Sequence, residues 1–231
     1  MIMTEERCLS AVRLFAALSP QGRAQIEKRC KWASADTAEF LVHHGDNSSE
    51  VYFVTKGRAR VSIYGGNGRA VRYREIKTGD YFGEFAAIDG QERSASVEAL
   101  EPCSMARLSS ADFLECLHRH PDISIALLQN AIGEIRVLTE RVFELSTLTV
   151  GHRVQAEQLR LARKGTVSAG WGRIAPAPRQ HDFADRIGTN REGVSREFGN
   201  LEALGVIRRD KTRSIDCDLV KLEMLVIQDG K

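Results

Sequence analysis

The chain has 231 residues, of which 42% are hydrophobic and 28% are charged, and its formal net charge is +2. These values are typical of a globular protein with one or two domains, and no apolar run approaches the ~18 residues of a membrane-spanning helix. The first ten residues, MIMTEERCLS, lack the apolar core of a secretory signal. We therefore expect a cytoplasmic protein that does not bind a membrane.

The cysteines and the distribution of charge narrow the classes of function. The closest two cysteines are thirteen residues apart, so the chain has neither the paired cysteines of a zinc ribbon nor the cluster of an iron–sulfur sensor, and we expect no metal. Residues 151–231 carry 15 Lys+Arg against 11 Asp+Glu, a net charge of +4, which weakly favours nucleic acid as a partner. The five cysteines are Cys8, Cys30, Cys103, Cys116 and Cys217.

The N-terminal part begins with helical patterns and continues as short strands. We expect a helix over Leu9–Leu18 and a second helix that Ser19 caps and Pro20 begins. From Phe40 onward, short β-branched and aromatic runs alternate with Gly- and Asp-containing turns, which indicates a closed antiparallel β-roll. The expected strands are Val51–Val54, Ala59–Tyr64, Ala70–Ile76, Ser94–Ala99 and Ser104–Leu108, with a hairpin connection at Gly65–Gly68.

The run from Gly79 to Ala95, GDYFGEFAAIDGQERSA, contains Glu84 and Arg93, nine residues apart, among glycine and apolar residues. Glu84 and Arg93 must be compensated there, either by each other as a structural ion pair or by a ligand. Phe85–Ile88 can form one helical turn, whose free amides and Arg93 would make an anion cradle. A carboxylate beside that cradle suits a ribose hydroxyl, so the run favours a nucleotide.

G-E-x-A followed by R-S-A resembles the phosphate-binding cassette of cyclic-nucleotide-binding domains. It is similar to that of the cyclic-AMP receptor (catabolite activator) family of Crp/Fnr-type bacterial transcription regulators. The resemblance implies that Glu84 binds the ribose 2′-OH and that Arg93 and Ser94 bind the cyclic phosphate. It also implies backbone contacts from Gly83 and Phe85, with Phe82 in the same site. The implied ligand is cAMP, with cGMP as a second candidate.

A long helix is expected after this domain. Ser110 caps a helix from Ala111, and Pro121 starts the next one. The a/d spacing of the residues that follow predicts a seam between two parallel copies of the helix, and the alternative is packing on the β-roll through Ile125, Leu138 and Leu145. The seam consists of Leu128, Ile132, Ile135, Thr139, Val142 and Ser146.

Thr139 is the polar residue of this seam. In the family that the chain resembles, hydroxyls on this helix read the purine base, and here Leu138 stands where a first hydroxyl would be. A threonine can donate to guanine O6 or accept from adenine N6. The alternative is that Thr139 only bonds the carbonyl four residues before it.

The helical pattern of the long helix breaks at Thr149–Gly151, which we interpret as a hinge. After the hinge we expect a short helix over Val154–Lys164 and a loop or hairpin over Gly165–Pro178. A helix-turn-helix follows. Its second helix, capped by Asn190, is expected to pack through Val194, Phe198, Leu201 and Leu204.

The opposite face of that helix presents Arg191, Glu192 and Arg196, side chains suited to guanine and cytosine edges in the major groove. N-R-E-x-V-x-R resembles the recognition helix of the same family, with Glu197 at a position that is usually apolar. Lys211 and Arg213 lie in a segment that resembles a wing, where cations contact phosphates. The alternative is a solvated charged face on a structural helix pair.

The sequence therefore predicts an α+β chain with an N-terminal antiparallel β-roll of the cyclic-nucleotide-binding fold (1–121), a long dimerisation helix and hinge (122–150) and a C-terminal winged helix-turn-helix (151–231). The resemblance implies a homodimeric transcription regulator that binds a palindromic double-stranded DNA site when loaded with cAMP, and RNA polymerase as a further partner. One alternative keeps the fold and changes the signal to redox state, haem or a metabolite. An enzyme is not expected, because no nucleophile–base pair or metal-ligand set accompanies the cassette.

Overall fold

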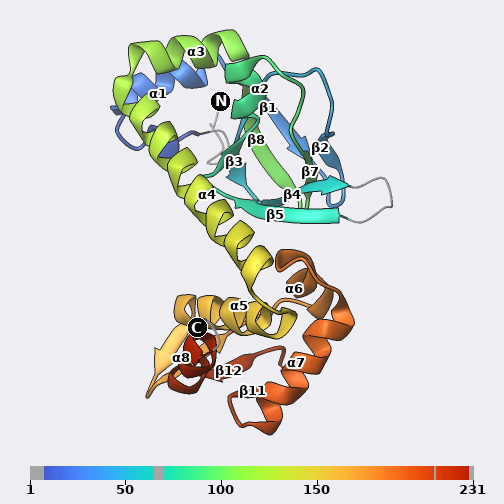
Figure 1. Ribbon diagram of the computed structural model, residues 1–231. Coiled ribbons are helices and arrows are strands. Elements are labelled where there is room, and N and C mark those ends of the chain that lie inside the picture. Colours follow the sequence, from blue (N-terminus) through green and yellow to red (C-terminus); the bar gives the residue numbers. More distant parts are fainter. Residues whose placement is uncertain (1–7, 65–69, 211, 229–231) are drawn as a thin grey trace. The chain divides into compact units, whose positions relative to one another are not determined.

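The computed structural model describes residues 8–64, 70–210 and 212–228. The chain divides into two compact units, Met1–Glu134 and Ile135–Lys231, which are described separately below (Figure 1). Among the described residues, no helix has the length and apolar character needed to cross a lipid bilayer.

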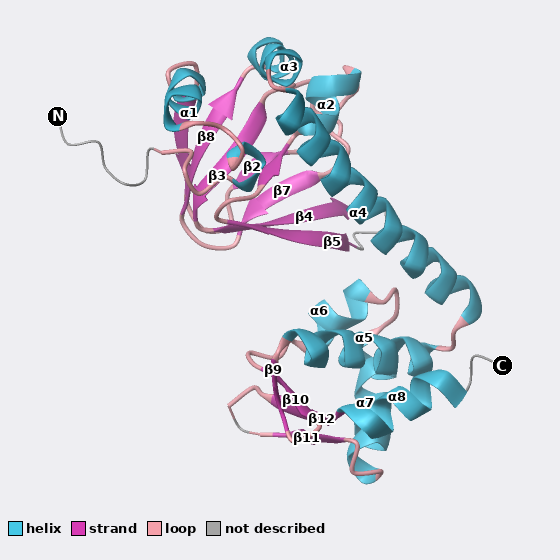
Figure 2. Cartoon of the chain, turned by 90° about the vertical axis from the view of Figure 1, so that its left-hand side faces the viewer, coloured by secondary structure: helices cyan, strands magenta, loops and turns pink. Residues whose placement is uncertain are grey.

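The first unit contains a β-roll made of two four-stranded antiparallel sheets, ordered β1-β8-β3-β6 and β2-β7-β4-β5 (Figure 2). The predicted strands are found within two residues of their expected bounds, and β1, β2 and β6 were not among them. Tyr64 pairs with Ala70 at the open end of β4 and β5, while the predicted Gly65–Gly68 connection lies outside the described residues. The strands are β1 (Lys31–Ala35), β2 (Phe40–Val42), β3 (Val51–Lys56), β4 (Arg58–Tyr64), β5 (Ala70–Lys77), β6 (Tyr81–Phe82), β7 (Ser96–Ala99) and β8 (Cys103–Leu108).

Helices gather at one end of the roll, where α1 and α3 lie side by side (Figures 1 and 2). Phe53 of β3 packs against Phe15 at a tilt of 50°, with 4.8 Å between the ring centroids, so aromatic packing joins the roll to this end of the unit. Arg29 bonds Asp112 and Glu115 of α3. The helices of this unit are α1 (Pro20–Glu27), α2 (Glu84–Asp89), α3 (Ser110–Arg119) and the start of α4 (Pro121–Thr147).

Two predictions at this end of the roll are corrected by the structure. The expected helix over Leu9–Leu18 is reduced to one 3-10 turn at Arg13–Phe15, because the Arg13 amide donates to the Gly79 carbonyl (3.1 Å) and ties the segment to the roll. The cap of α3 is Ser109 rather than Ser110, since the Ser109 hydroxyl accepts from the Asp112 amide. The Ser19 cap of α1 is confirmed.

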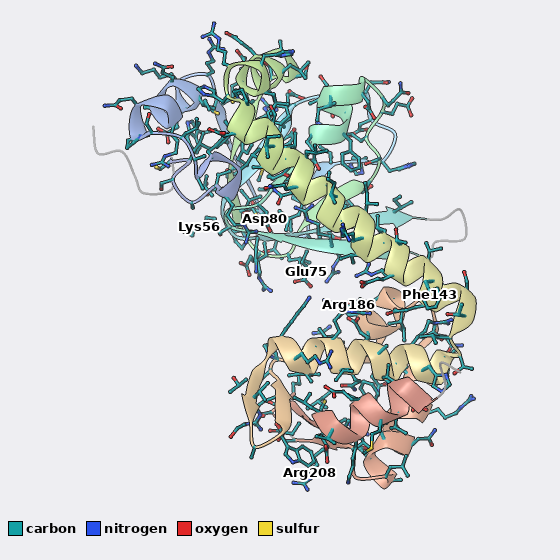
Figure 3. All side chains as sticks on the ribbon, turned by 60° about the vertical axis from the view of Figure 1, so that its left-hand side comes forward. Lys56, Glu75, Asp80, Phe143, Arg186 and Arg208 are labelled. Atoms are coloured by element: carbon teal, nitrogen blue, oxygen red, sulfur yellow. The ribbon has the colours of Figure 1, made fainter. Side chains whose placement is uncertain are left out.

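Helix α4 carries the predicted seam on its surface. Leu128, Ile132, Ile135 and Val142 are between 43% and 63% exposed in the single chain. The alternative stripe of Ile125, Leu138 and Leu145 is also about half exposed. Phe143, labelled in Figure 3, is 64% exposed. An apolar face of this size on one long helix is therefore available to another surface.

The second unit is a small α/β layer around one core. A four-stranded antiparallel sheet, ordered β11-β12-β10-β9, packs with α5, α6, α7 and α8 around Phe183, Val194 and Phe198. The break before α5 falls at residues 148–149, so Val150 and Gly151 are helical rather than part of the hinge. The elements are α5 (Val150–Lys164), β9 (Thr166–Ser168), β10 (Trp171–Ile174), α6 (Gln180–Arg186), α7 (Arg191–Ala203), β11 (Ile207–Arg209), β12 (Ile215–Asp218) and α8 (Leu219–Gln228).

Candidate functional site

The predicted cassette is built on a left-handed glycine between β6 and α2. Gly83 has φ +88°, and a Cβ there would lie 2.7 Å from the Glu50 carbonyl oxygen and would collide with Nη1 of Arg93. Only glycine leaves room for the arginine at this turn. The helical turn expected at Phe85–Ile88 is confirmed as α2.

Arg93 is buried in the first unit, with 3% of its surface exposed. Its Nε donates to Ser48 Oγ (2.9 Å), Nη1 to the Gly83 carbonyl (3.0 Å) and Nη2 to the Glu50 carbonyl (2.8 Å). The guanidinium is therefore oriented by an uncharged hydroxyl and two backbone carbonyls. Ser48 and Glu50 lie more than forty residues before Arg93 in the sequence, and no motif identifies them.

Aromatic rings support the same guanidinium. Arg93 Cζ lies 5.7 Å from the centroid of the Tyr52 ring, and Tyr52 stacks on Phe82 at 4.7 Å with an interplanar angle of 1°. Phe82 is thus a buried supporting residue that reaches Arg93 through Tyr52. Burial lowers the pKa of Arg93 from its ordinary value, while Tyr52 and Glu50 act in the opposite direction.

Glu84 is the half-buried first residue of α2. Burial raises the pKa of its carboxyl above the usual value, and its own backbone amide, Arg74 and Arg93 act to lower it, in that order. Within the described chain Glu84 forms no ion pair with Arg93, so the alternative of a structural Glu84–Arg93 pair is wrong for this structure.

The remaining predicted ligand contacts differ in their accessibility. Ser94 and Phe85 are exposed, the latter by 55%, on the segments that flank Arg93 and Glu84. Thr139 belongs to the second unit, where it is exposed on α4 and its hydroxyl donates to the Ile135 carbonyl (2.9 Å). The bond to the carbonyl four residues earlier therefore exists, and it uses the proton of the hydroxyl while leaving its oxygen able to accept.

The predicted helix-turn-helix consists of α6, a left-handed Gly188 (φ +63°) and α7. Phe183 and Phe198 pack edge to face at 5.3 Å and hold the two helices together. The Asn190 side chain accepts from the Gly193 amide (2.9 Å), as the cap prediction requires. The prediction for Leu204 is wrong, because that side chain is 61% exposed after the end of α7.

The side chains predicted to read bases lie on the exposed face of α7. Arg191, Glu192 and Arg196 are all exposed, and Arg191 Nε makes only a long 3.5 Å contact with Gln180 Oε1. They form one polar face on a helix whose other face is buried through Val194 and Phe198.

Further cations lie on β11 and in the segment between β11 and β12. Arg213 is exposed, yet its Nη2 donates to the Ala177 carbonyl (3.0 Å), and the predicted Lys211 lies outside the described residues. Arg208, which was not among the predicted contacts, lies with its Cζ 4.3 Å from the Trp171 ring centroid (Figure 3). Arg213 is thus bonded to the loop before α6, and Arg208 packs on a ring of β10.

Glu197, the expected exception in α7, has specific partners. Its Oε1 accepts from Gln155 Nε2 of α5 (2.7 Å), and its Oε2 accepts from Asn200 Nδ2 (3.1 Å). A polar contact between α5 and α7 therefore replaces the apolar packing expected at this position.

Comparison with protein families identifies both halves of the molecule. Residues 34–120 match the cyclic nucleotide-binding domain, and residues 153–225 match the Crp-like helix-turn-helix domain. The chain belongs to the Crp/Fnr family. The members of this family are transcription regulators rather than enzymes, which confirms the expected class and fold.

Curated relatives and solved structures agree with this assignment. The chain is 28% identical over 168 residues to the cAMP-activated global transcriptional regulator CRP of Salmonella typhimurium, covering 72% of this chain and 80% of the relative. A structure of a CooA mutant from Carboxydothermus hydrogenoformans superposes with a TM-score of 0.80 at 16% identity, covering 96% of this chain and 99% of the other. The c-di-GMP responsive global regulator CLP of Xanthomonas campestris has a TM-score of 0.72 at 15% identity, covering 86% and 99%. The last two similarities concern the fold alone.

Members of this fold thus carry names that refer to different signals, and the chemistry of this chain's own site has to indicate which one it takes. Among the described residues, no group of three or more His, Cys, Asp or Glu side chains has the arrangement of a metal site.

Proposed function

We propose that this Crp/Fnr-family chain is a cyclic-nucleotide-responsive transcription regulator, which binds a palindromic DNA site as a homodimer when loaded with cAMP and takes cGMP as a second ligand. In this proposal residues 1–121 bind the nucleotide, 122–150 join two protomers and 151–231 bind DNA. The protein acts in the cytoplasm. The observation that carries the proposal is that the buried Arg93 guanidinium keeps N–H groups that the protein does not use.

Arg93 retains donors for an anion. A guanidinium has five N–H groups, and the bonds to Ser48, Gly83 and Glu50 use three of them. The two that remain suit the paired oxygens of a phosphodiester, since Arg binds such groups in a bidentate manner. Exposed Ser94 adds a hydroxyl donor beside them.

Glu84 suits the ribose. A half-buried carboxylate without an ion-pair partner in the described chain is poorly compensated, as its raised pKa indicates. A ribose 2′-OH would donate to this carboxylate and replace the water that burial removes. We therefore assign Glu84 to the ribose, with Gly83, Phe85 and Phe82 forming the surrounding turn.

The choice of cAMP rests on the curated relatives and on Thr139. CRP of Salmonella typhimurium is named as cAMP-activated. The Thr139 hydroxyl donates to Ile135, so its oxygen is left to accept, and adenine N6–H₂ is a donor whereas guanine O6 is not. Thr139 is accordingly proposed to discriminate between the two bases.

Dimerisation and DNA binding are proposed from exposed faces. The seam of α4 leaves four large aliphatic side chains at least 43% exposed, which a second copy of the helix would cover. Arg191, Glu192 and Arg196 would read base edges, Asn190 would set the start of α7, and Lys211 and Arg213 would contact phosphates. RNA polymerase is a further proposed partner.

A ligand shifts such a regulator only by binding one of its states more tightly than the other. The proposed switch is a change in the α4 seam and the 148–149 break that sets two recognition helices about one DNA turn apart.

The proposal is tested by isothermal titration calorimetry with cAMP and cGMP, followed by operator binding with each nucleotide at saturation. We expect both nucleotides to bind and cAMP to strengthen operator binding more. Absence of heat with both nucleotides, in a protein that is folded by circular dichroism, would refute the nucleotide proposal.

A different signal for the same fold is the second candidate. It is favoured by the three protein partners that Arg93 already has, and by the c-di-GMP responsive CLP among the structures of this fold. Redox sensing through Cys30 or Cys116 is less favoured, because burial raises the pKa of Cys30 to about 12 and of Cys116 to about 11, which leaves little reactive thiolate at neutral pH. Titration with c-di-GMP in the same calorimeter would distinguish the two ligands.

A further inference from the structure

A cluster of polar side chains joins α4 to the strand that leads into the cassette, and all of its members belong to the first unit. Arg74 of β5 forms an ion pair through Nη1 with Glu134 of α4, and its Nη2 lies 3.5 Å from the Tyr81 carbonyl oxygen. One turn before Glu134, Asn130 Nδ2 donates to the Tyr81 hydroxyl (3.2 Å). Tyr81 is three residues before Glu84, so the cluster borders the proposed ribose site.

The effects on the pKa of Glu84 also indicate that Arg74 and Glu134 are its neighbours. Arg74 lowers the pKa of the Glu84 carboxyl more than Arg93 does, and Glu134 raises it. Since Arg93 is the proposed phosphate ligand and Glu84 the proposed ribose ligand, we place the base attached to that ribose against the neighbouring pair of Arg74 and Glu134.

The Arg74–Glu134 pair is accessible to a ligand. The two side chains are 30% and 50% exposed, in contrast to the buried Arg93. In the described contacts Arg74 uses two of its five N–H groups, and one oxygen of Glu134 is occupied. The pair therefore presents unused hydrogen-bond donors next to an unused acceptor.

A donor beside an acceptor complements one edge of adenine. Adenine carries the N7 acceptor next to the N6–H₂ donor, whereas guanine carries two acceptors, N7 and O6, at the same edge. A carboxylate accepts from N6–H₂ but repels O6, and an arginine donates to N7 in either base.

We propose that Glu134 and Arg74 read the purine edge of the bound nucleotide, with Glu134 accepting from N6 of adenine and Arg74 donating to N7. This rests on the proposed function and adds two specificity-determining residues to it. Glu134 selects cAMP over cGMP, and Arg74 contributes equally to both ligands.

The test is calorimetry of the full-length protein with cAMP and cGMP, comparing wild type, Glu134→Gln, Arg74→Leu and a control, Glu101→Gln. Glu101 is a matched control because it forms an Arg–Glu pair with Arg58 on the same roll, with similar exposure. A glutamine amide can donate to O6 as well as accept from N6. We therefore expect Glu134→Gln to bind cGMP more tightly than wild type does and to reduce the cAMP:cGMP affinity ratio about tenfold.

Arg74→Leu should weaken both nucleotides by similar factors, and Glu101→Gln should change neither. A gain in cGMP affinity is the decisive readout, because loss of a merely structural ion pair would not produce it. If Glu134→Gln leaves the affinity ratio at its wild-type value while both nucleotides bind, this inference is overturned and the proposed function stands. If wild type binds neither nucleotide, the proposed function fails and the inference fails with it.

Discussion

Replacing Arg93 by leucine separates the two roles of this buried guanidinium, which binds the proposed phosphate and also holds the glycine turn. For the ligand, the substitution removes the two N–H groups that the protein leaves unused. Hydrogen bonds to charged groups contribute about 1.5–3 kcal/mol each, so we expect a loss of about 3–6 kcal/mol. This corresponds to cAMP affinity that is about 10²- to 10⁴-fold weaker.

For the fold, the same substitution leaves the Gly83 and Glu50 carbonyls and the Ser48 hydroxyl without their donor. Each lost bond costs about 1 kcal/mol. Removing a charge from a buried position offsets part of that cost. We therefore expect a net destabilisation of about 1–3 kcal/mol and a midpoint of thermal unfolding that is a few degrees lower.

The assay combines calorimetry with thermal unfolding for wild type, Arg93→Leu and Arg58→Leu. Arg58 is a suitable control because it is an exposed arginine of the same roll that bonds Glu101 instead of the cassette. Arg58→Leu should retain wild-type affinity. Wild-type cAMP affinity in a folded Arg93→Leu protein would refute the assignment of Arg93 to the phosphate.

Three further substitutions test other parts of the molecule. Glu84→Gln should raise the midpoint of thermal unfolding at pH 7, because burial raises the carboxyl pKa of Glu84 in the folded state and makes its ionisation there unfavourable. This gain in stability should disappear as the pH falls through the folded-state pKa towards 4.5. A gain that is independent of pH would contradict the burial argument. Arg191→Ala should lose discrimination at one operator base pair, by about 1–3 kcal/mol across a base-substitution series, whereas Arg213→Ala should weaken all sequences alike and reduce the salt dependence of binding. Thr139→Ala should reduce the difference between cAMP and cGMP in operator affinity at saturation, and an unchanged difference would leave Thr139 with only its bond to Ile135.

Features specified by neighbouring residues were predictable from the sequence. The Ser19 cap, the helical turn at Phe85–Ile88 and the Asn190 cap each depend on local backbone chemistry, and all three are found. Where a distant segment decides the conformation, the prediction was wrong. The expected helix over Leu9–Leu18 is replaced by a tether to Gly79, a contact that its helical periodicity does not encode.

The same distinction applies to the candidate site. Glu84 and Arg93 could be recognised from their spacing in the cassette, but the partners of Arg93 could not. Two of those partners are backbone carbonyls, which any residue can supply, and the third is Ser48, one of several serines in polar surroundings. Arg74 and Glu134 are sixty residues apart and become neighbours only when α4 packs beside β5.

The bond between Gln155 and Glu197 determines which segment of this regulator can be transplanted. Moving α7 alone into a related protein with an apolar residue at the α5 position would leave Glu197 Oε1 without its donor, at a cost of about 1–3 kcal/mol, while Asn200 of α7 would still donate to Oε2. A chimera that transfers α5 together with α6 and α7 keeps the donor with its acceptor. We therefore expect the proposed operator specificity to transfer with the three helices α5, α6 and α7 and not with α7 alone.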